Sequence, residues 1–273
     1  METADGNAMN AANDVLTADT AKAVESAKAE TVTLFGVDVS KMGMHQTVEY
    51  LVEAVRRRRP THVVTANPIM FMTGFEDERF MSMLRNADLV VPDGAGLVWA
   101  ARRLGKPVAE RVAGFDLVQE LFRIGAKEGW SVYLLGTTQE LIEAARDRIL
   151  EKYPGIRIVG CRNGFFGPSE DDEVVRDISE AAPDLLLVGR ATWTQDPWIA
   201  QHHQRLNVPV MIGVGGSFDV MSGQLKRAPR WMQKMGLEWF HRLLLQPSRW
   251  RRMLVLPKFA LKVMVFGEKG RTP

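Results

Sequence analysis

Three polar side chains follow two short apolar segments that the sequence predicts to be β-strands. Thr65 and Asn67 come at the end of His62–Thr65, and Asp93 comes just after Leu89–Val91. Because the carboxyl ends of parallel strands lie along one edge of a sheet, where open α/β folds bind ligands, we expect these side chains to face one crevice. Asp93 would then be available as a general base. The alternatives are structural: a helix N-cap for Asp93, and a turn for the Asn that precedes a proline.

Glycine-rich turns follow four other predicted strands, at 136–138, 164–167, 189–192 and 213–217. Backbone can approach a phosphate closely at such turns, and helix N-termini favour anions. No turn matches a dinucleotide fingerprint or a P-loop, so each is a weak signal by itself. Together they indicate a ligand of nucleotide size, with ordinary tight turns as the alternative. The candidate contacts in these turns are Gly136, Phe165, Gly189 and Gly215.

The pattern of metal-ligand side chains predicts no metal site. The histidines are scattered, and no Asp-x-Asp of the kind that holds a metal on a sugar nucleotide is present. We also expect no cofactor, since the dinucleotide fingerprint of an oxidoreductase is missing. Without a metal ion, arginines would have to stabilise the negative charge of a departing diphosphate. A planar guanidinium is suited to phosphate oxygens. Arg242, Arg249 and Arg252 would share one side of a continuous helix, although Pro247 interrupts it. Solvation or lipid headgroup contact is the alternative.

From Thr61 onwards the chain alternates short apolar strands with amphipathic helical segments, which predicts an α/β fold. We expect a Rossmann-like, mostly parallel sheet flanked by helices, with a basic amphipathic helical appendage at the C-terminus. The predicted strands are His62–Thr65, Leu89–Val91, Val132–Leu135, Ile156–Val159, Leu185–Val188 and Val208–Val214, preceded by Val32–Phe35 and Val37–Val39. The predicted helices include Ile69–Arg85, Ala95–Leu104, Asp196–Leu206 and Trp231–Leu245.

Composition divides the 273 residues into three parts. Residues 1–30 lack a sustained apolar period and are predicted to be a disordered arm, and 31–225 form the α/β core. Residues 226–273 carry 12 Lys and Arg against Glu238 and Glu268, a net +10, so the rest of the chain carries −8 of the total +2. A basic tail on an acidic body indicates an anionic partner: membrane lipid, a diphosphate or nucleic acid.

The tail also predicts where the protein works. Within 248–265, bulky apolar residues alternate with Arg and Lys, a pattern suited to a membrane interface rather than to nucleic acid. The alternative is that this apolar face packs on the core. Cys161 is the single cysteine, and no secretory signal or spanning segment is visible. We therefore expect a cytoplasmic protein, peripheral on the inner face of the plasma membrane and without a nucleic-acid partner, and we leave open whether it is a homo-oligomer.

Several motifs in a fixed order resemble the WecG/TagA/CpsF glycosyltransferases. The resemblance covers roughly Val32 to Phe266. The matching stretches are TANP at 65–68, ADLVVPDG at 87–94, ERVAGFD at 110–116, GVGGSFD at 213–219 and RAPRWMQ at 227–233, continued by GLEW at 236–239.

The resemblance implies an inverting, metal-independent transferase. Such an enzyme would move a hexose, of N-acetylmannosamine or glucose type, from a UDP-sugar to a polyprenyl-diphosphate-linked saccharide for surface polysaccharide. Asp93 would be the catalytic base, with Thr65 and Asn67 beside it. The other site residues that it implies are Arg111 and Gln195 in the pocket, Asp219 at the nucleotide, and Arg242, Arg249 and Arg252 supplied by a membrane-reaching appendage.

One stretch departs from the family pattern. After the strand Leu185–Val188 the family usually reads Gly-x-Gly-x-Pro-x-Gln-Glu-x-Trp, whereas this chain has Ala191, Trp193 and Asp196 in place of the second Gly, the Pro and the Glu. The departure indicates a different donor sugar or reduced activity. The alternative function is a catalytically degenerate relative that binds lipid-linked saccharide or acts as a scaffold.

Overall fold

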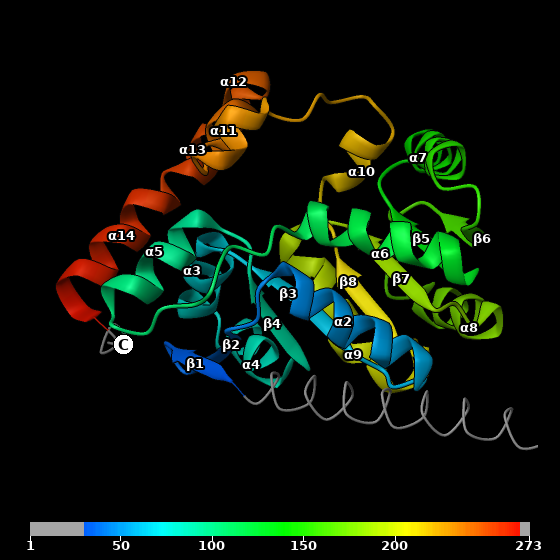
Figure 1. Cartoon of the computed structure of the whole chain (residues 1–273), viewed down its shortest axis with the longest axis horizontal. Coiled ribbons are helices and arrows are strands. Elements are labelled where there is room, and N and C mark those ends of the chain that lie inside the picture. The colour runs from blue at the N-terminus through cyan, green and yellow to red at the C-terminus, as the bar shows by residue number, and fades with distance from the viewer. Residues whose placement is uncertain (1–29, 268–273) are drawn as a thin grey trace, which may run out of the picture.

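The computed structural model describes residues 30–267 and contains one six-stranded sheet and one hairpin (Figure 1). The sheet strands are β3 (His62–Ala66), β4 (Leu89–Pro92), β5 (Ser131–Gly136), β6 (Arg157–Arg162), β7 (Leu185–Gly189) and β8 (Val210–Gly213). They run in the order β4-β3-β8-β7-β5-β6, and every neighbouring pair is parallel. The predicted α/β fold is therefore confirmed.

Helices cover both faces of the sheet, which explains why the inner strands β7 and β8 are unbroken apolar runs, whereas the edge strand β6 is only partly buried. The helices of this part are α2 (Met44–Arg56), α3 (Pro68–Glu76), α4 (Glu78–Asn86), α5 (Ala95–Arg103), α6 (Gly114–Glu128), α7 (Gln139–Lys152), α8 (Asp171–Ala181), α9 (Thr192–Leu206) and α10 (Ser217–Met221). Alternate strand residues point to opposite faces. Val63, Leu187 and Ile212 pack with α2, α6 and α7, whereas Val64 packs with α3–α5 and Met211 with α8 and α9.

The hairpin of β1 (Thr31–Leu34) and β2 (Val37–Ser40) agrees with the two predicted strands. Its two-residue turn places both Phe35 (φ 54°) and Gly36 (φ 80°) in the left-handed region, as tight hairpins require. A bulky residue is disfavoured there. Phe35 is nevertheless 2% exposed, because its ring packs edge-on against Phe71 and Phe259. Tertiary packing therefore stabilises a locally unfavourable turn.

The prediction of one helix over Ile69–Arg85 is wrong. Asp77 adopts an extended conformation, ends α3 and begins α4. Its carboxylate accepts hydrogen bonds from the backbone N–H groups of Arg79 and Phe80, the usual action of an N-cap. Both helices bury apolar residues, Met70 and Phe71 in α3 and Phe80 and Leu84 in α4. The apolar period therefore continues past Asp77, and periodicity alone did not reveal the break.

The C-terminal part is helical, as expected, but its breaks differ from the prediction. It comprises α11 (Arg230–Lys234), α12 (Glu238–Leu245), the 3-10 turn η1 (Pro247–Arg249), α13 (Trp250–Met253) and α14 (Val255–Phe266). The predicted helix Trp231–Leu245 is interrupted at Gly236, whose φ is 70°. Pro257 is not a break, because it lies in the first turn of α14, where a backbone N–H is not needed. The predicted disordered arm lies outside the described residues, except for Glu30.

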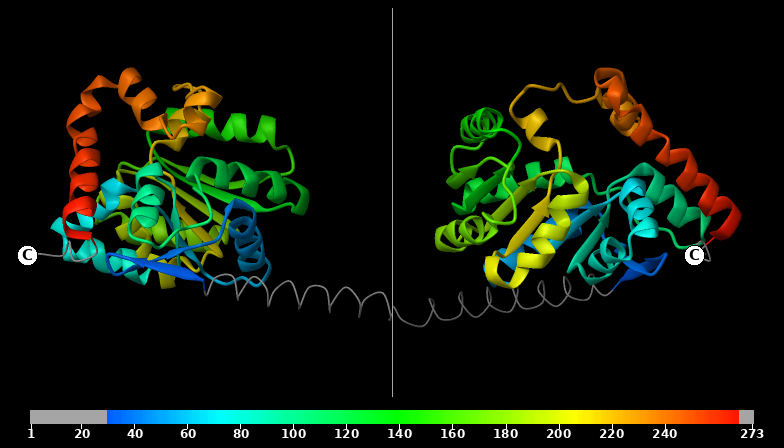
Figure 2. Two further views of the ribbon diagram at one scale, coloured as in Figure 1. Left: turned by 60° about the vertical axis from the view of Figure 1, so that its left-hand side comes forward. Right: turned by 180° about the vertical axis from the view of Figure 1, so that it is seen from behind.

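α14 returns along α3 and α5, as both views in Figure 2 show. Phe259 and Val263 are 1% and 2% exposed within the cluster that α3, α4 and the hairpin form. Leu261, Met264 and Val265, on the other side of the helix, are more than half exposed. The alternative that this helix packs on the core is therefore confirmed for the face of Phe259 and Val263, while the opposite face is exposed and apolar. No helix within residues 30–267 is both long enough and apolar enough to cross a bilayer.

Phe259→Ala is expected to lower the free energy of unfolding by about 3–5 kcal/mol, because it leaves a cavity among buried aromatic rings. Urea denaturation at fixed pH measures this change. Leu261→Ala is the control, since its side chain is 58% exposed. That variant should differ from the wild type by less than about 0.5 kcal/mol. A Phe259 variant as stable as the wild type would mean that α14 is not docked on the core in solution.

Candidate active site

A cavity of about 320 Å³ lies at the carboxyl ends of β3, β4 and β8, beneath α12 and α13. Its size and place are those of a ligand pocket in an open α/β sheet. The cavity brings together nine of the residues predicted from sequence: Thr65, Asn67, Asp93, Arg111, Gln195, Gly215, Arg242, Arg249 and Arg252. Gly136, Phe165, Gly189 and Asp219 do not line it.

Asp93 joins the ends of two strands and presents its carboxylate to the cavity. Its backbone N–H donates to the carbonyl oxygen of Ala66, 2.9 Å away. The N-cap alternative is wrong, because Gly94 occupies the cap of α5 and no side chain bonds there. Burial raises the pKa of Asp93 to about 6, although the Arg111 guanidinium and the Gly114 N–H act in the opposite direction. The carboxylate is therefore mostly ionised at pH 7, and 29% of the side chain remains exposed.

Thr65 and Asn67 hold the neighbouring part of the cavity. The side-chain oxygen of Asn67 accepts hydrogen bonds from the N–H groups of Ile69 (3.0 Å) and Met70 (3.3 Å), so it caps α3. The structural alternative for Asn67 is therefore a helix N-cap rather than a turn, and Asn67 lines the cavity as well. Thr65 packs against Gly114, where an added Cβ would lie 3.1 Å from the Thr65 hydroxyl. This close approach favours glycine at 114.

Three guanidinium groups from the C-terminal helices cover the cavity. Arg242 donates to the carbonyl oxygen of Gly216 (3.3 Å) and lies 3.4 Å from the carboxylate of Asp219. Burial and the neighbouring Arg249 and Arg252 lower the pKa of Arg242. Burial and Arg249 likewise lower the pKa of Arg252. The helix carrying them is broken at η1, yet the break turns all three toward one cavity. These three arginines repel one another, and of the three only Arg242 lies beside the Asp219 carboxylate. Such a group of cations forms a site that favours a polyanion.

A chain of ion pairs ties these helices to the core. Arg111 hydrogen-bonds the backbone carbonyl of Asp93 and the carboxylate of Glu238. Arg227 donates to the other carboxylate oxygen of Glu238 (3.1 Å) and forms a bidentate ion pair with Asp116, with hydrogen bonds of 2.6 and 2.7 Å. The arrangement places α12, and with it Arg242, over the strand ends. Sequence reasoning gave no role to Asp116, Arg227 or Glu238, although all three stand in the matching motifs.

Comparison with known proteins agrees with this geometry. The sequence profile of the glycosyl transferase WecG/TagA/CpsF family matches residues 32–272. The chain belongs to this family. It is 32% identical over 244 residues to the N-acetylglucosaminyldiphosphoundecaprenol N-acetyl-beta-D-mannosaminyltransferase of Bacillus subtilis, covering 89% of this chain and 94% of that protein. The Staphylococcus aureus (strain NCTC 8325) protein of the same name is 33% identical, over 85% and 91% of the two chains. This protein is therefore a glycosyltransferase.

The stretch in which this WecG/TagA/CpsF member departs from the family pattern forms the start of α9 and part of the cavity wall. The guanidinium of Arg252 lies 5.7 Å from the ring centroid of Trp193, which is 60% exposed. Arg252 also donates to the Thr192 hydroxyl at 2.7 Å. The bulky Trp193 is therefore a contact for one of the three arginines, worth about 0.5–1 kcal/mol as an exposed cation–π pair.

Gln195, in the first turn of α9, connects this helix to the glycine turn after β8. Its oxygen accepts from the N–H of Gly215 (2.8 Å), and its NH₂ donates to Asp196 (3.0 Å). The second oxygen of Asp196 lies 3.4 Å from the His62 ring, and both side chains are almost fully buried. An added Cβ at Gly213 would lie 2.5 Å from Gln195 and from Asp196, so only glycine fits. Asp196, which is shorter than the Glu of the family pattern, is thus held between Gln195 and His62 behind the pocket.

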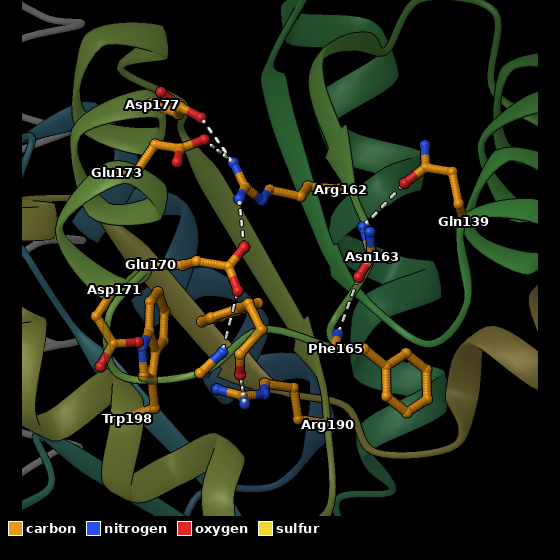
Figure 3. Close-up of polar contacts among 12 residues, drawn as sticks. Gln139, Arg162, Asn163, Phe165, Glu170, Asp171, Glu173, Asp177, Arg190 and Trp198 are labelled. Atoms are coloured by element: carbon orange, nitrogen blue, oxygen red, sulfur yellow. Dashed lines mark hydrogen bonds and ion pairs between the residues drawn. The ribbon is translucent and has the colours of Figure 1, made fainter.

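The remaining predicted contacts of this glycosyltransferase lie outside the cavity. Gly136 and Gly189 pack backbone on backbone, where a Cβ on Gly136 would lie 2.4 Å from the Gly189 carbonyl oxygen. Phe165 is 76% exposed, and Figure 3 shows its ring projecting from the loop after β6. At the end of β6, Arg162 binds Glu173 and Asp177 of α8, a structural network separate from the pocket. Asp219 contacts the pocket only through Arg242.

No metal-binding cluster is found in the described part of the chain. Within residues 30–267, no three or more His, Cys, Asp or Glu side chains are placed to hold a metal ion. His202 and His203, adjacent in α9, face different carboxylates: Asp171 at 3.6 Å and Asp88 at 3.0 Å. The positive charge facing the cavity comes from arginine side chains.

Proposed function

We propose that this protein transfers a hexose from a UDP-sugar to a polyprenyl-diphosphate-linked saccharide, with inversion and without a metal ion, in the synthesis of a surface polysaccharide. The relatives, named for N-acetylmannosaminyl transfer to N-acetylglucosaminyldiphosphoundecaprenol, support N-acetylmannosamine as the donor sugar. The observation that carries the proposal is one partly buried carboxylate, Asp93, in a cavity covered by three arginines.

The proposed reaction is a direct displacement at the anomeric carbon. A hydroxyl oxygen of the acceptor attacks that carbon while the bond from it to the UDP oxygen breaks, and the hydroxyl proton passes to Asp93. A base with a pKa of about 6 is largely ionised at pH 7 and still accepts the proton. Attack from the face opposite to UDP inverts the anomeric configuration.

The arginines have the second role. Negative charge grows on the departing diphosphate, and Arg242, Arg249 and Arg252 are already oriented toward the cavity, so they stabilise that charge with little reorganisation. In this proposal the guanidinium groups replace the divalent cation that many UDP-sugar transferases use. Gln195 holds the 213–216 turn, whose backbone would approach the nucleotide.

A transfer assay tests the proposal. Full-length protein is incubated in EDTA with a short-chain N-acetylglucosaminyl diphosphate lipid and with UDP-N-acetylmannosamine or UDP-glucose, and the linkage of the product is determined by NMR. We expect transfer with inverted configuration from the preferred donor. UDP binding without transfer from either donor would favour the alternative, a degenerate relative that binds lipid-linked saccharide.

We further propose that α11–α14 contact the inner face of the plasma membrane, with the site on the cytoplasmic side. Large apolar side chains on these helices are about 40–66% exposed: Trp231, Met235, Trp239, Phe240, Leu244, Leu245, Trp250, Leu254, Leu261, Met264, Val265 and Phe266. Arg251 and Lys258 are exposed among them. Exposed apolar residues in such number, mixed with cations, suit an anionic lipid surface.

The triple variant Trp250→Ser, Leu254→Ser and Met264→Ser is expected to bind vesicles of anionic phospholipid at least about tenfold more weakly, since each buried apolar side chain contributes roughly 1.5–3 kcal/mol. Co-sedimentation measures the binding. Leu150→Ser is the control, because Leu150 is a partly exposed residue of α7, outside these helices. Unchanged binding by the triple variant would exclude this surface as the membrane contact.

A further inference from the structure

A second groove adjoins the active-site cavity. Its volume is about 620 Å³, and it lies between α5, the segment 109–116 and α11. Arg111, Ala113, Arg227 and Glu238 line both spaces, so a single layer of side chains separates them. The ion pair between Arg111 and Glu238 is part of that layer. A molecule lying in the groove would therefore meet Arg111, 3.6 Å from the Asp93 carboxylate, on its way to the base.

Two cations in this groove have no partner. Arg102 on α5 and Lys234 on α11 line the groove, and both are exposed. Within the part of the chain described, neither side chain makes an ion pair or a hydrogen bond. The acidic side chains of the groove are already engaged. Glu110 accepts from the N–H of Met44 at 2.6 Å, while Asp116 and Glu238 bind arginines. The groove thus offers two unpaired positive charges to an anion.

Apolar side chains line another part of the groove. Trp99 and Met235 are 39% and 66% exposed there. Met235 follows α11 directly, so this part of the lining is continuous with the exposed apolar surface of the C-terminal helices. A ligand that fits has an apolar part beside Trp99 and Met235, an anionic group near Arg102 and Lys234, and a polar group toward Arg111. A polyprenyl-linked diphosphate saccharide has these three parts.

The length of α5 allows a saccharide to lie at Asp93 while the diphosphate lies at Arg102. Asp93 immediately precedes the N-cap of α5, and Arg102 is in its last turn. A rise of 1.5 Å per residue puts Arg102 about 12 Å along the helix from its N-cap. A flexible guanidinium at that distance can reach the diphosphate of an acceptor whose sugar hydroxyl is at Asp93.

We propose that this groove binds the diphosphate and the first isoprene units of the acceptor, with Arg102 and Lys234 on the phosphates. The saccharide then enters the cavity past the Arg111–Glu238 pair, while the donor occupies the side beneath Arg242 and Arg252. This assignment rests on the proposed function, because it takes the acceptor class from it.

The test is a steady-state assay of the double variant Arg102→Gln and Lys234→Gln, with a short-chain acceptor and no membrane. Losing two charge-assisted contacts should raise the KM for the acceptor at least about tenfold. The KM for the donor and kcat should change less than about twofold, because neither residue touches the donor cavity. The matched control is Arg103→Gln with Arg230→Gln, which removes the same charge from the same two helices but outside the groove.

Further measurements distinguish the loss of a contact to the acceptor diphosphate from the loss of a contact to membrane lipid. A soluble N-acetylglucosaminide without diphosphate should be used equally by wild type and variant. An unchanged acceptor KM, or an equal rise in donor KM, would overturn the proposal. So would a variant defective only in binding anionic vesicles, since the cations would then serve membrane lipid. If wild type transfers no sugar at all, the proposed function fails; calorimetric titration with the short-chain lipid diphosphate still decides the groove, with weaker binding by the double variant expected.

Discussion

Asp93→Asn is expected to lower kcat at least about a hundredfold, because the amide cannot accept the proton of the attacking hydroxyl. UDP should bind as it does to the wild type, since the substitution is nearly isosteric and leaves the three arginines in place. Single-turnover measurements with saturating donor give the rate, and calorimetry gives the UDP affinity. Near-normal turnover in the variant would remove Asp93 from the role of base.

The raised pKa of Asp93 supplies a control for misfolding. The wild-type kcat/KM should fall as the pH drops through about 6, where Asp93 becomes protonated, and the residual activity of the variant should lack this step. The stability effect has the opposite sign. A carboxyl whose pKa rises from 3.8 to about 6 on folding destabilises the folded state increasingly as the pH rises through that window. The Asn variant should therefore melt at a higher temperature than the wild type at pH 7. A lower melting temperature would contradict this account of the buried charge.

Arg242→Gln is expected to reduce kcat/KM by about a hundredfold or more, because it removes a preoriented positive charge from the departing diphosphate. Arg242 donates to the Gly216 carbonyl oxygen and lies near the Asp219 carboxylate. Steady-state kinetics with varied donor measure the loss. A Gln side chain keeps some hydrogen bonding but no charge, so kcat should fall together with kcat/KM.

Two further variants make this prediction specific. Arg242→Lys keeps the charge without the planar fork and should recover part of the activity. Arg251→Gln is the control: this residue of α13 lies beside Trp250, outside the cavity, and its loss should leave the kinetics within about twofold of wild type. A change of less than about threefold for Arg242→Gln would mean that the charge on the leaving group is met elsewhere.

Local patterns in the sequence predicted much of this protein. Short apolar strands alternating with amphipathic helices indicated the parallel sheet, since strands buried on both faces must be apolar throughout. The same reasoning placed Thr65, Asn67 and Asp93 at one edge, because strand ends of a parallel sheet necessarily meet. The helix break at Asp77 was missed, since a capping Asp is not distinguished by an apolar period that continues past it.

Other features exist only in three dimensions. Arg111 and Glu238 are 127 residues apart, and Arg227 and Asp116 are 111 apart, so no local pattern could pair them. The pKa of Asp93 follows from burial and from these same charges, which depend on how α12 sits over the strand ends. Likewise, composition left open whether the apolar residues of α14 pack on the core or face lipid. Packing decided this for Phe259 and Val263, which are buried in the core, because burial is a property of the neighbours that the folded chain brings together.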